Sequence, residues 1–284
     1  MDAASPLRDV SDTALWVAHY RAEESDRPDA AFRDPFARRL AGERGRQIAA
    51  HMGIDAFSWT LVARTHLIDR VVEEQAARGV DLVLNLAAGL DTRPYRLTLP
   101  AALRWVEADL PGMIEYKEGL LRGETPVCRL ERVAVDLADA AARRALFETL
   151  ARGAGKTLVI TEGLLIYLEP ALVSSLAEDL RDAGFSRWVL ELSSPGILRR
   201  TRPIVGAKLD AARAPFKFGP AEGPGYFAPR GWNTLEVRSL IKAARKIGRL
   251  SPLMWLISWL PESSGKQGDT PWSGVCLFEN ARTR

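Results

Sequence analysis

Acidic side chains and small residues recur along this chain at the ends of short apolar runs. They are Ala87-Ala88-Gly89 after the run 82–86, Glu107 and Asp109 at the end of the run 104–108, Asp136-Leu137 after the run 132–135, and Glu162-Gly163 after the run 158–161. Carboxylates accept hydrogen bonds from hydroxyl groups, and small residues let the backbone approach a ligand closely. Each match is weak alone, because an acid there can simply cap a helix. Together they indicate a binding site.

The elements that must position these residues are predicted from the same runs. A fifth run covers 188–192, a late run at 275–279 could add an edge strand, and helical patterns at 138–150 and 170–183 lie between runs. Buried strands alternating with helices are typical of an α/β protein with a doubly wound, mostly parallel, Rossmann-like sheet. Ligands of such sheets bind at the carboxyl ends of the strands.

The spacing of the acids favours a nucleoside ligand. Glu107 lies twenty residues beyond Ala87, and Asp109 twenty beyond Gly89, a separation that suits an acid holding a ribose diol. A dinucleotide site prefers G-x-G-x-x-G, but here Ala87 and Thr92 occupy the first and third glycine positions. The loop therefore favours S-adenosylmethionine, which has no phosphate, although a nicotinamide-dependent oxidoreductase remains the alternative.

The segments before and after the predicted strands indicate how the chain is divided. Residues 1–79 are expected to form a helical segment packed on the core, and residues 80–284 the ligand-binding α/β domain. The stretch from about 195 to 232 is rich in proline, glycine and aromatic residues. Such a segment after a strand fits a lid over the site or a long surface connection.

Composition narrows the class of protein. The 284 residues are 47% hydrophobic and 26% charged, and the net charge of +3 is spread without a long basic block, which favours a solvated surface over nucleic-acid binding. Cys128 and Cys276 have no zinc spacing, so neither a metal site nor a disulfide framework is expected, and a cytoplasmic location fits. The start shows no signal-peptide pattern.

One apolar segment, 253–260, is too short to span a bilayer, so no membrane span is expected. We expect it to be a helix packed on the core, with an exposed contact patch as the alternative. The sequence does not determine the oligomeric state.

Read in order, the motifs resemble those of the leucine carboxyl methyltransferase family, in particular its bacterial branch of S-adenosylmethionine-dependent O-methyltransferases. The matching segments are Arg33-Asp34-Pro35-Phe36-Ala37, Ala63-Arg64-Thr65, Asn85 to Arg93, Glu107 to Pro111 with Lys117, Asp136-Leu137, and Glu162 to Leu168. The family usually has glycine where this chain has Ala87, which is the one clear departure.

The resemblance implies roles for the site residues. Arg64, assisted by Arg21, would pair with the methionyl carboxylate, since a guanidinium fits a carboxylate at two points. The turn from Ala87 to Gly89 would pass under the methionine moiety. The remaining roles would be ribose binding by Asp109 and Glu107, adenine contact by Asp136 and Leu137, and a place near the cofactor for Glu162.

The family chemistry would be direct in-line transfer of a methyl group to an oxygen of a small-molecule metabolite. A carboxylate acceptor needs no general base, because it is ionised near neutral pH. A hydroxyl acceptor would need one, and Tyr167 and His66 are the candidates. Arg199, Arg200 and Arg202 are candidates for receiving an acidic acceptor. A non-catalytic module that keeps the methyltransferase fold for binding remains a further alternative.

Overall fold

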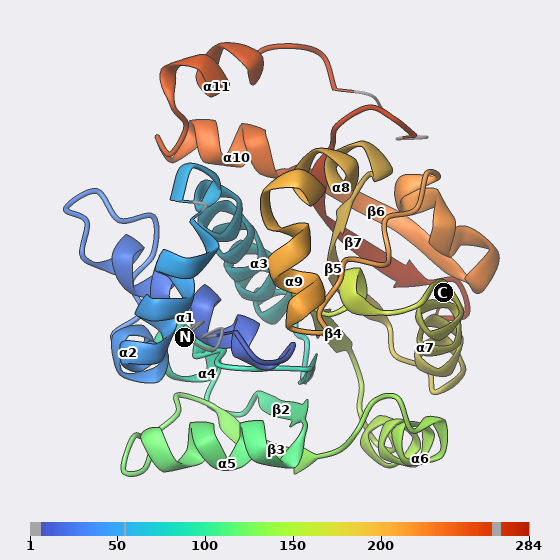
Figure 1. The fold of residues 1–284 in the computed structure, drawn as a ribbon. Coiled ribbons are helices and arrows are strands. Elements are labelled where there is room, and N and C mark those ends of the chain that lie inside the picture. The colour runs from blue at the N-terminus through green and yellow to red at the C-terminus, as the bar shows by residue number, and fades with distance from the viewer. Residues whose placement is uncertain (1–6, 54, 263–267, 284) are drawn as a thin grey trace.

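The computed structural model describes residues 7–53, 55–262 and 268–283, and it is built around one seven-stranded sheet (Figure 1). The strands are β1 (Leu82–Leu86), β2 (Arg104–Asp109), β3 (Arg129–Ala134), β4 (Thr157–Thr161), β5 (Arg187–Ser193), β6 (Trp232–Ser239) and β7 (Ser273–Asn280). Their order in the sheet is β3-β2-β1-β4-β5-β7-β6. The pairs among β1 to β5 are parallel, whereas β7 is antiparallel to both β5 and β6. The predicted α/β fold with a mostly parallel sheet is confirmed.

Helices cover the sheet and extend beyond it. They are α1 (Asp12–Ser25), α2 (Ala37–Met52), α3 (Trp59–Ala77), α4 (Arg93–Arg96), α5 (Pro111–Leu120), α6 (Ala140–Ala151), α7 (Pro170–Asp182), α8 (Pro195–Thr201), α9 (Ala207–Ala211), α10 (Leu240–Lys246) and α11 (Pro252–Ile257). There are also the 3-10 helices η1 (Asp55–Phe57), η2 (Leu165–Tyr167) and η4 (Gly223–Arg230) and the π-helix η3 (Arg202–Gly206). Helices α3 and α10 share one apolar cluster with the sheet. Helices α6 and α7 share another, so both faces are covered.

The order of the strands reverses between β1 and β4, because β1 is followed by β2 on one side and β4 pairs on the other. Both central strands are buried along their whole length, which is why their sequences are apolar without alternation. Such a reversal point separates the loops that leave the two neighbouring strands and opens a crevice at their carboxyl ends. The acids noted in the sequence lie at these ends.

The two outer strands differ from the sequence prediction. The run 275–279 is a strand, but β7 lies between β5 and β6 and is not at the edge. The edge strand is β6, which the sequence analysis missed. Residues 233–237 of β6 are exposed, and the register shifts between Thr234 and Glu236, so the strand shows neither an apolar run nor an alternating pattern.

The prediction for residues 253–260 was wrong in its packing. The segment contains α11, but no residue of this helix is buried. Leu253 and Trp259 are 67% and 63% exposed. The helix stands outside α10, at the top of Figure 1. No helix of the described residues is long and apolar enough to cross a membrane.

Aromatic side chains pack around Trp188 of β5, and this cluster gives a test of the fold. Trp188 is fully buried, its Nε1 donates to Thr161 Oγ1 at 3.0 Å, and its ring lies 5.1 Å from that of Phe227. We expect Trp188→Ala to lower the free energy of unfolding by about 3–5 kcal/mol, because it leaves a cavity and an unpaired hydroxyl. Trp255→Ala, at a side chain that is 46% exposed, should change it by less than about 0.5 kcal/mol. Urea denaturation measures both variants, and an equal loss of unfolding free energy in the two would contradict this packing.

Candidate active site

A cavity of about 310 Å³ opens at the carboxyl ends of β1, β2 and β4. Residues of α1 and of the segment 213–217 also line it. Of the residues proposed from the sequence, those lining it are Arg21, Arg64, Ala87, Gly89, Asp109, Asp136, Leu137, Glu162 and Tyr167. Glu107 and His66 do not line it. Residues that are far apart in the sequence therefore meet in one place.

The loop after β1 has a strained backbone at its first residue. Ala87 has φ +50° and Gly89 has φ +48°, both in the left-handed region that favours glycine. A side chain at Gly89 would place its Cβ 3.2 Å from Cβ of Ala14 on α1. The loop thus runs close under α1, and the alanine at position 87 occupies a conformation that suits a glycine.

Asp109 holds this loop from the neighbouring strand. Its Oδ2 accepts from the Gly89 amide at 2.6 Å, and its Oδ1 accepts from the Leu110 amide at 2.7 Å. Burial raises the pKa of Asp109, although these two bonds oppose the rise. Each carboxylate oxygen keeps lone-pair capacity for a further donor, so Asp109 can bind a pair of hydroxyl groups from the cavity.

Glu107 does not line the cavity and instead forms two buried ion pairs. Its side chain is fully buried, and it pairs with Lys117 at 2.8 Å and with Arg132 at 2.9 Å. Both of its oxygens are therefore occupied by cations from α5 and β3. Of the two acids at the required spacing, only Asp109 at the last position of β2 reaches the cavity.

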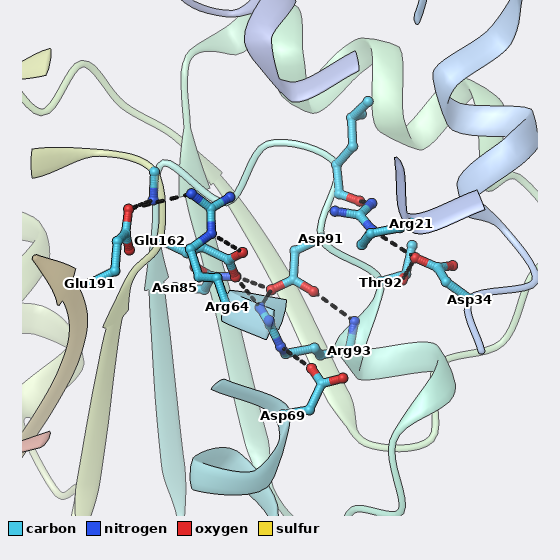
Figure 2. Close-up of polar contacts among 12 residues, drawn as sticks. Arg21, Asp34, Arg64, Asp69, Asn85, Asp91, Thr92, Arg93, Glu162 and Glu191 are labelled. Carbon is cyan, nitrogen blue, oxygen red and sulfur yellow. Dashed lines mark hydrogen bonds and ion pairs between the residues drawn. The ribbon is translucent and has the colours of Figure 1, made fainter. Parts of the chain in front are cut away.

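Arg64 is the centre of a buried chain of charges (Figure 2). Its Nε lies 2.9 Å from Glu162 Oε1, and its Nη1 lies 3.6 Å from Glu191 Oε1. The other oxygen of Glu162 lies 2.8 Å from Nη1 of Arg93. Glu162 is thus a bridge between two guanidinium groups. Arg64 lines the cavity while these ion pairs use its Nε and Nη1, so Nη2 can receive an incoming carboxylate.

The charge chain continues below the loop. Oδ2 of Asp91 accepts hydrogen bonds from Nδ2 of Asn85 at 2.8 Å and from Nη1 of Arg93 at 2.6 Å. Although burial opposes ionisation, Arg93 and Lys117 hold the pKa of Asp91 well below its ordinary value. The carboxylate is therefore charged at neutral pH. It fixes the start of α4 and, through Asn85, the end of β1.

Arg21 fastens the far end of the loop. Its Nε pairs with Asp34 at 2.9 Å, and its Nη2 donates to the carbonyl oxygen of Leu90. Asp34 also accepts from the hydroxyl of Thr92 at 2.7 Å. Arg21 therefore lines the cavity mainly as a residue that positions residues 90–92, and its described partners already occupy much of its donor set.

The loop after β3 forms another part of the cavity wall. Asp136 Oδ1 accepts from the Ala138 amide at 2.9 Å, and the Leu137 carbonyl accepts from Arg143 at 2.7 Å. Arg143 is fully buried and also pairs with Asp179. The sequence analysis missed Arg143 as a residue of this wall, because its role depends on α6 packing against α7.

Further residues that line the cavity were also missed. They are Val10, Ser11, Thr13, Ala14 and Val17 from α1 and the turn before it. No spacing signal marks them, since they look like one side of an ordinary helix. Arg199, Arg200 and Arg202, which were candidates for receiving an acidic acceptor, do not line the cavity, and Arg199 pairs with Asp269.

Tyr167 lines the cavity from η2, with its ring 5.6 Å from that of Phe216. Burial raises the pKa of its phenol above the usual value, so the group is protonated at neutral pH. A protonated phenol can donate a hydrogen bond but is a poor base. None of the described residues that line the cavity is a histidine.

Comparisons with known proteins show the family to which the chain belongs. A sequence model of the family described as leucine carboxyl methyltransferase matches residues 14–181. A protein of Streptomyces coelicolor, provisionally named an S-adenosyl-L-methionine-dependent methyltransferase, is 36% identical over 78% of this chain and 82% of its own. A similarly named protein of Frankia alni is 34% identical over 84% of this chain and 89% of its own.

Solved structures share the fold. A DUF574 family protein from Streptomyces avermitilis superposes with a TM-score of 0.59 at 13% identity, over 93% of this chain and 96% of its own. A provisionally assigned methyltransferase from Thermobifida fusca also has a TM-score of 0.59, at 15% identity, over 84% of this chain and 89% of its own. The family model and the relatives show an S-adenosylmethionine-dependent methyltransferase, and its sheet is Rossmann-like. The chain belongs to the leucine carboxyl methyltransferase family.

The left-handed backbone at Ala87 gives a test of the loop. We expect Ala87→Gly to leave the free energy of unfolding unchanged or to raise it by up to about 1 kcal/mol, because relief of the strain at φ +50° exceeds the entropy that glycine adds to the unfolded chain. Ala145→Gly, at an exposed position within α6, should lower it by about 1 kcal/mol. Thermal and urea unfolding measure both, and a similar loss in the two variants would rule out strain at Ala87.

Glu191 gives a test of the charge chain by pH. Burial raises the pKa of Glu191 to about 7 from 4.5, despite the nearby Arg64, and its Oε2 is buried without a hydrogen-bond partner. The folded protein then binds this proton more tightly than the unfolded chain does, so the contribution of Glu191 to stability falls as the pH rises from 4.5 to about 7.

We therefore expect the unfolding free energy of the wild type, relative to Glu191→Gln, to fall by about 3 kcal/mol through this window and to level off above it. Urea unfolding of both proteins at a series of pH values measures the difference. A difference that does not change with pH would show that Glu191 has an ordinary pKa.

Proposed function

We propose that this protein is an S-adenosylmethionine-dependent O-methyltransferase that methylates a carboxylate of a small-molecule metabolite by direct in-line transfer. The observation that carries the proposal is that Arg64 and Asp109, a cation with a free donor edge and an acid with lone pairs to spare, line the same cavity. The two ends of the cofactor need these two partners, a guanidinium for its carboxylate and a carboxylate for its ribose diol.

The residues present fit S-adenosylmethionine in other respects. The cavity wall provides Leu137 and Val135 for a flat apolar ring, beside the carboxylate of Asp136. The loop from Ala87 to Gly89 has no side chain larger than a methyl group, so the methionine moiety can lie against its backbone. Arg64 is held in place by Glu162 before any ligand arrives, which lowers the entropic cost of binding.

A nicotinamide cofactor fits less well. Its pyrophosphate would have to lie at the helix that follows β1, and α4 has only four residues there. Asp91, whose pKa is well below its ordinary value, puts a buried negative charge directly before that helix. A second negative charge would be repelled at this point, so the oxidoreductase alternative is not favoured.

The side chains around the cavity suit an acceptor that is already ionised. When bound, the cofactor supplies a methyl group on a sulfonium, which is activated without help from the protein. The chain's own residues bind and orient the reactants, and α1 with residues 213–217 lines the cavity beside them. Tyr167, with its raised pKa, supplies a hydrogen-bond donor. Among the described residues that line the cavity there is no histidine, and Asp109, Asp136 and Glu162 are already bound to backbone amides or to a cation, so a carboxylate is the favoured nucleophile over a hydroxyl.

Isothermal titration with S-adenosylmethionine tests the proposal. We expect Arg64→Lys, which keeps a cation beside Glu162 but loses the planar fork, and Asp109→Asn, which keeps the shape, each to weaken binding roughly tenfold or more. Arg200→Gln changes an exposed charge outside the cavity and should bind like the wild type.

The same preparations can be given methyl-labelled cofactor and matched pairs of carboxylic acids and primary alcohols. We expect label in base-labile esters of the acids. Absence of cofactor binding by the wild type at high micromolar concentration would contradict the proposal. Normal affinity in both site variants would rule out the roles assigned to Arg64 and Asp109. Label found only in ethers would show that the acceptor group is a hydroxyl and not a carboxylate.

A further inference from the structure

Arg213 occupies a backbone position where glycine is expected. It follows the end of α9 and has φ +55°. Its amide donates to the carbonyl of Asp210 at 3.0 Å, and the Ala214 amide donates to the carbonyl of Leu209 at 2.8 Å. These two bonds form the turn that commonly ends a helix, and the residue in the left-handed conformation there is usually glycine. The chain keeps a long cationic side chain at a place where it strains the backbone.

The turn cannot relax, because its neighbours are buried. Leu209, Ala212 and Ala214 are each at most 2% exposed and pack in one cluster with residues of α1 and α2. This packing holds Arg213 at the mouth of the cavity, which its exposed side chain lines. Within residues 7–53, 55–262 and 268–283, no acid forms an ion pair with Arg213. Strained residues of this kind are concentrated at ligand sites.

A second cation stands on the same segment. Lys217 lines the cavity, and its amide donates to the carbonyl of Ile166 at 2.7 Å. Phe216, between the two cations, packs on Tyr167. The Nζ of Lys217 lies 3.0 Å from Glu169, but this pair is exposed on both sides, and such pairs contribute little. Lys217 can therefore exchange Glu169 for a ligand anion at small cost.

We propose that Arg213 and Lys217 bind an anionic group of the acceptor that is distinct from the oxygen receiving the methyl group. The acceptor is thus an acid with a second anionic group, a carboxylate or a phosphate, held at the cavity mouth. The oxygen that attacks a sulfonium needs a free lone pair, and charge-assisted hydrogen bonds from two cations would reduce its nucleophilicity. This inference rests on the proposed function, and it adds the substrate class.

Binding of matched probes to the protein loaded with S-adenosylhomocysteine tests the inference. The probes are terephthalate, 4-(phosphonooxy)benzoate and 4-carbamoylbenzoate, which share a ring and one carboxylate and differ in the second group. We expect at least one of the two probes with a second anionic group to bind roughly tenfold or more tightly than the carbamoyl probe, and the stronger of them identifies the anion.

The variants separate ligand binding from folding. Arg213→Gly should remove the preference while raising Tm by about 2–4 °C through relief of the strained backbone, with the affinity for S-adenosylhomocysteine unchanged. Arg213→Lys should restore part of the preference. Arg200→Gln, with the same loss of charge outside the cavity, should keep it in full.

Two results would overturn the inference. One is the lack of any preference for a second anion in the wild type, including failure of all three probes to bind. The other is a preference that persists in Arg213→Gly. Failure of the proposed function looks different, because the wild type would then not bind the cofactor product at all. The probes would in that case be titrated into the ligand-free protein, where an Arg213-dependent preference would still support an anion site.

Discussion

The ion pair between Arg64 and Glu162 is the interaction on which the site depends. Both side chains are 12–14% exposed, and Glu162 is shared with Arg93. Burying charged groups costs free energy unless each has a partner of opposite charge. Removing one partner therefore leaves the other as an unpaired charge in the low-dielectric interior. Arg64 comes from α3, Glu162 from the end of β4, and Arg93 from α4. The pairs therefore fix three separate elements around one point of the cavity.

The same arrangement prepares the site before a ligand arrives. Asp91 and Asn85 join the charge chain to the end of β1, while Asp109 holds the loop through the Gly89 amide. Positive φ angles at positions 87 and 89 turn this loop toward the cavity, where α1 lies against it. Because these contacts exist in the protein alone, ligand binding need not order the loop, and more of the interaction energy remains for affinity.

The cavity mouth is built differently from its base. Among the described residues at the carboxyl ends of the strands, the carboxylates of Asp109 and Asp136 line the cavity and form no ion pair, which suits a ligand with a sulfonium and an ammonium group. At the mouth, Arg213 and Lys217 come from a segment that reaches the cavity only because Leu209 and Ala214 are buried against the N-terminal helices. This distribution of charge along one cavity supports the proposal of a cationic methyl donor and an anionic acceptor.

The central sheet and most of the base of the site were predictable from the sequence, because they rest on local signals. The run 82–86 is buried on both faces and coincides with β1, and the acids follow strands whose ends meet at one edge. Local signals fail where burial is partial or where tertiary packing decides. They do not reveal β6, whose residues are largely exposed, nor do they separate Glu107 from Asp109, since both have a suitable spacing.

Arg213 and the residues of α1 carry no sequence signal of a binding site, because they reach the cavity only in the folded chain. The most direct measurement of the role given to Arg64 is a crystal structure of the protein with S-adenosylhomocysteine. We predict that Nη2 of Arg64 contacts the carboxylate of the ligand while Nε stays on Glu162, and that Asp109 accepts from the ribose hydroxyls. A ligand carboxylate bound elsewhere, with Arg64 still paired only to Glu162 and Glu191, would contradict this assignment.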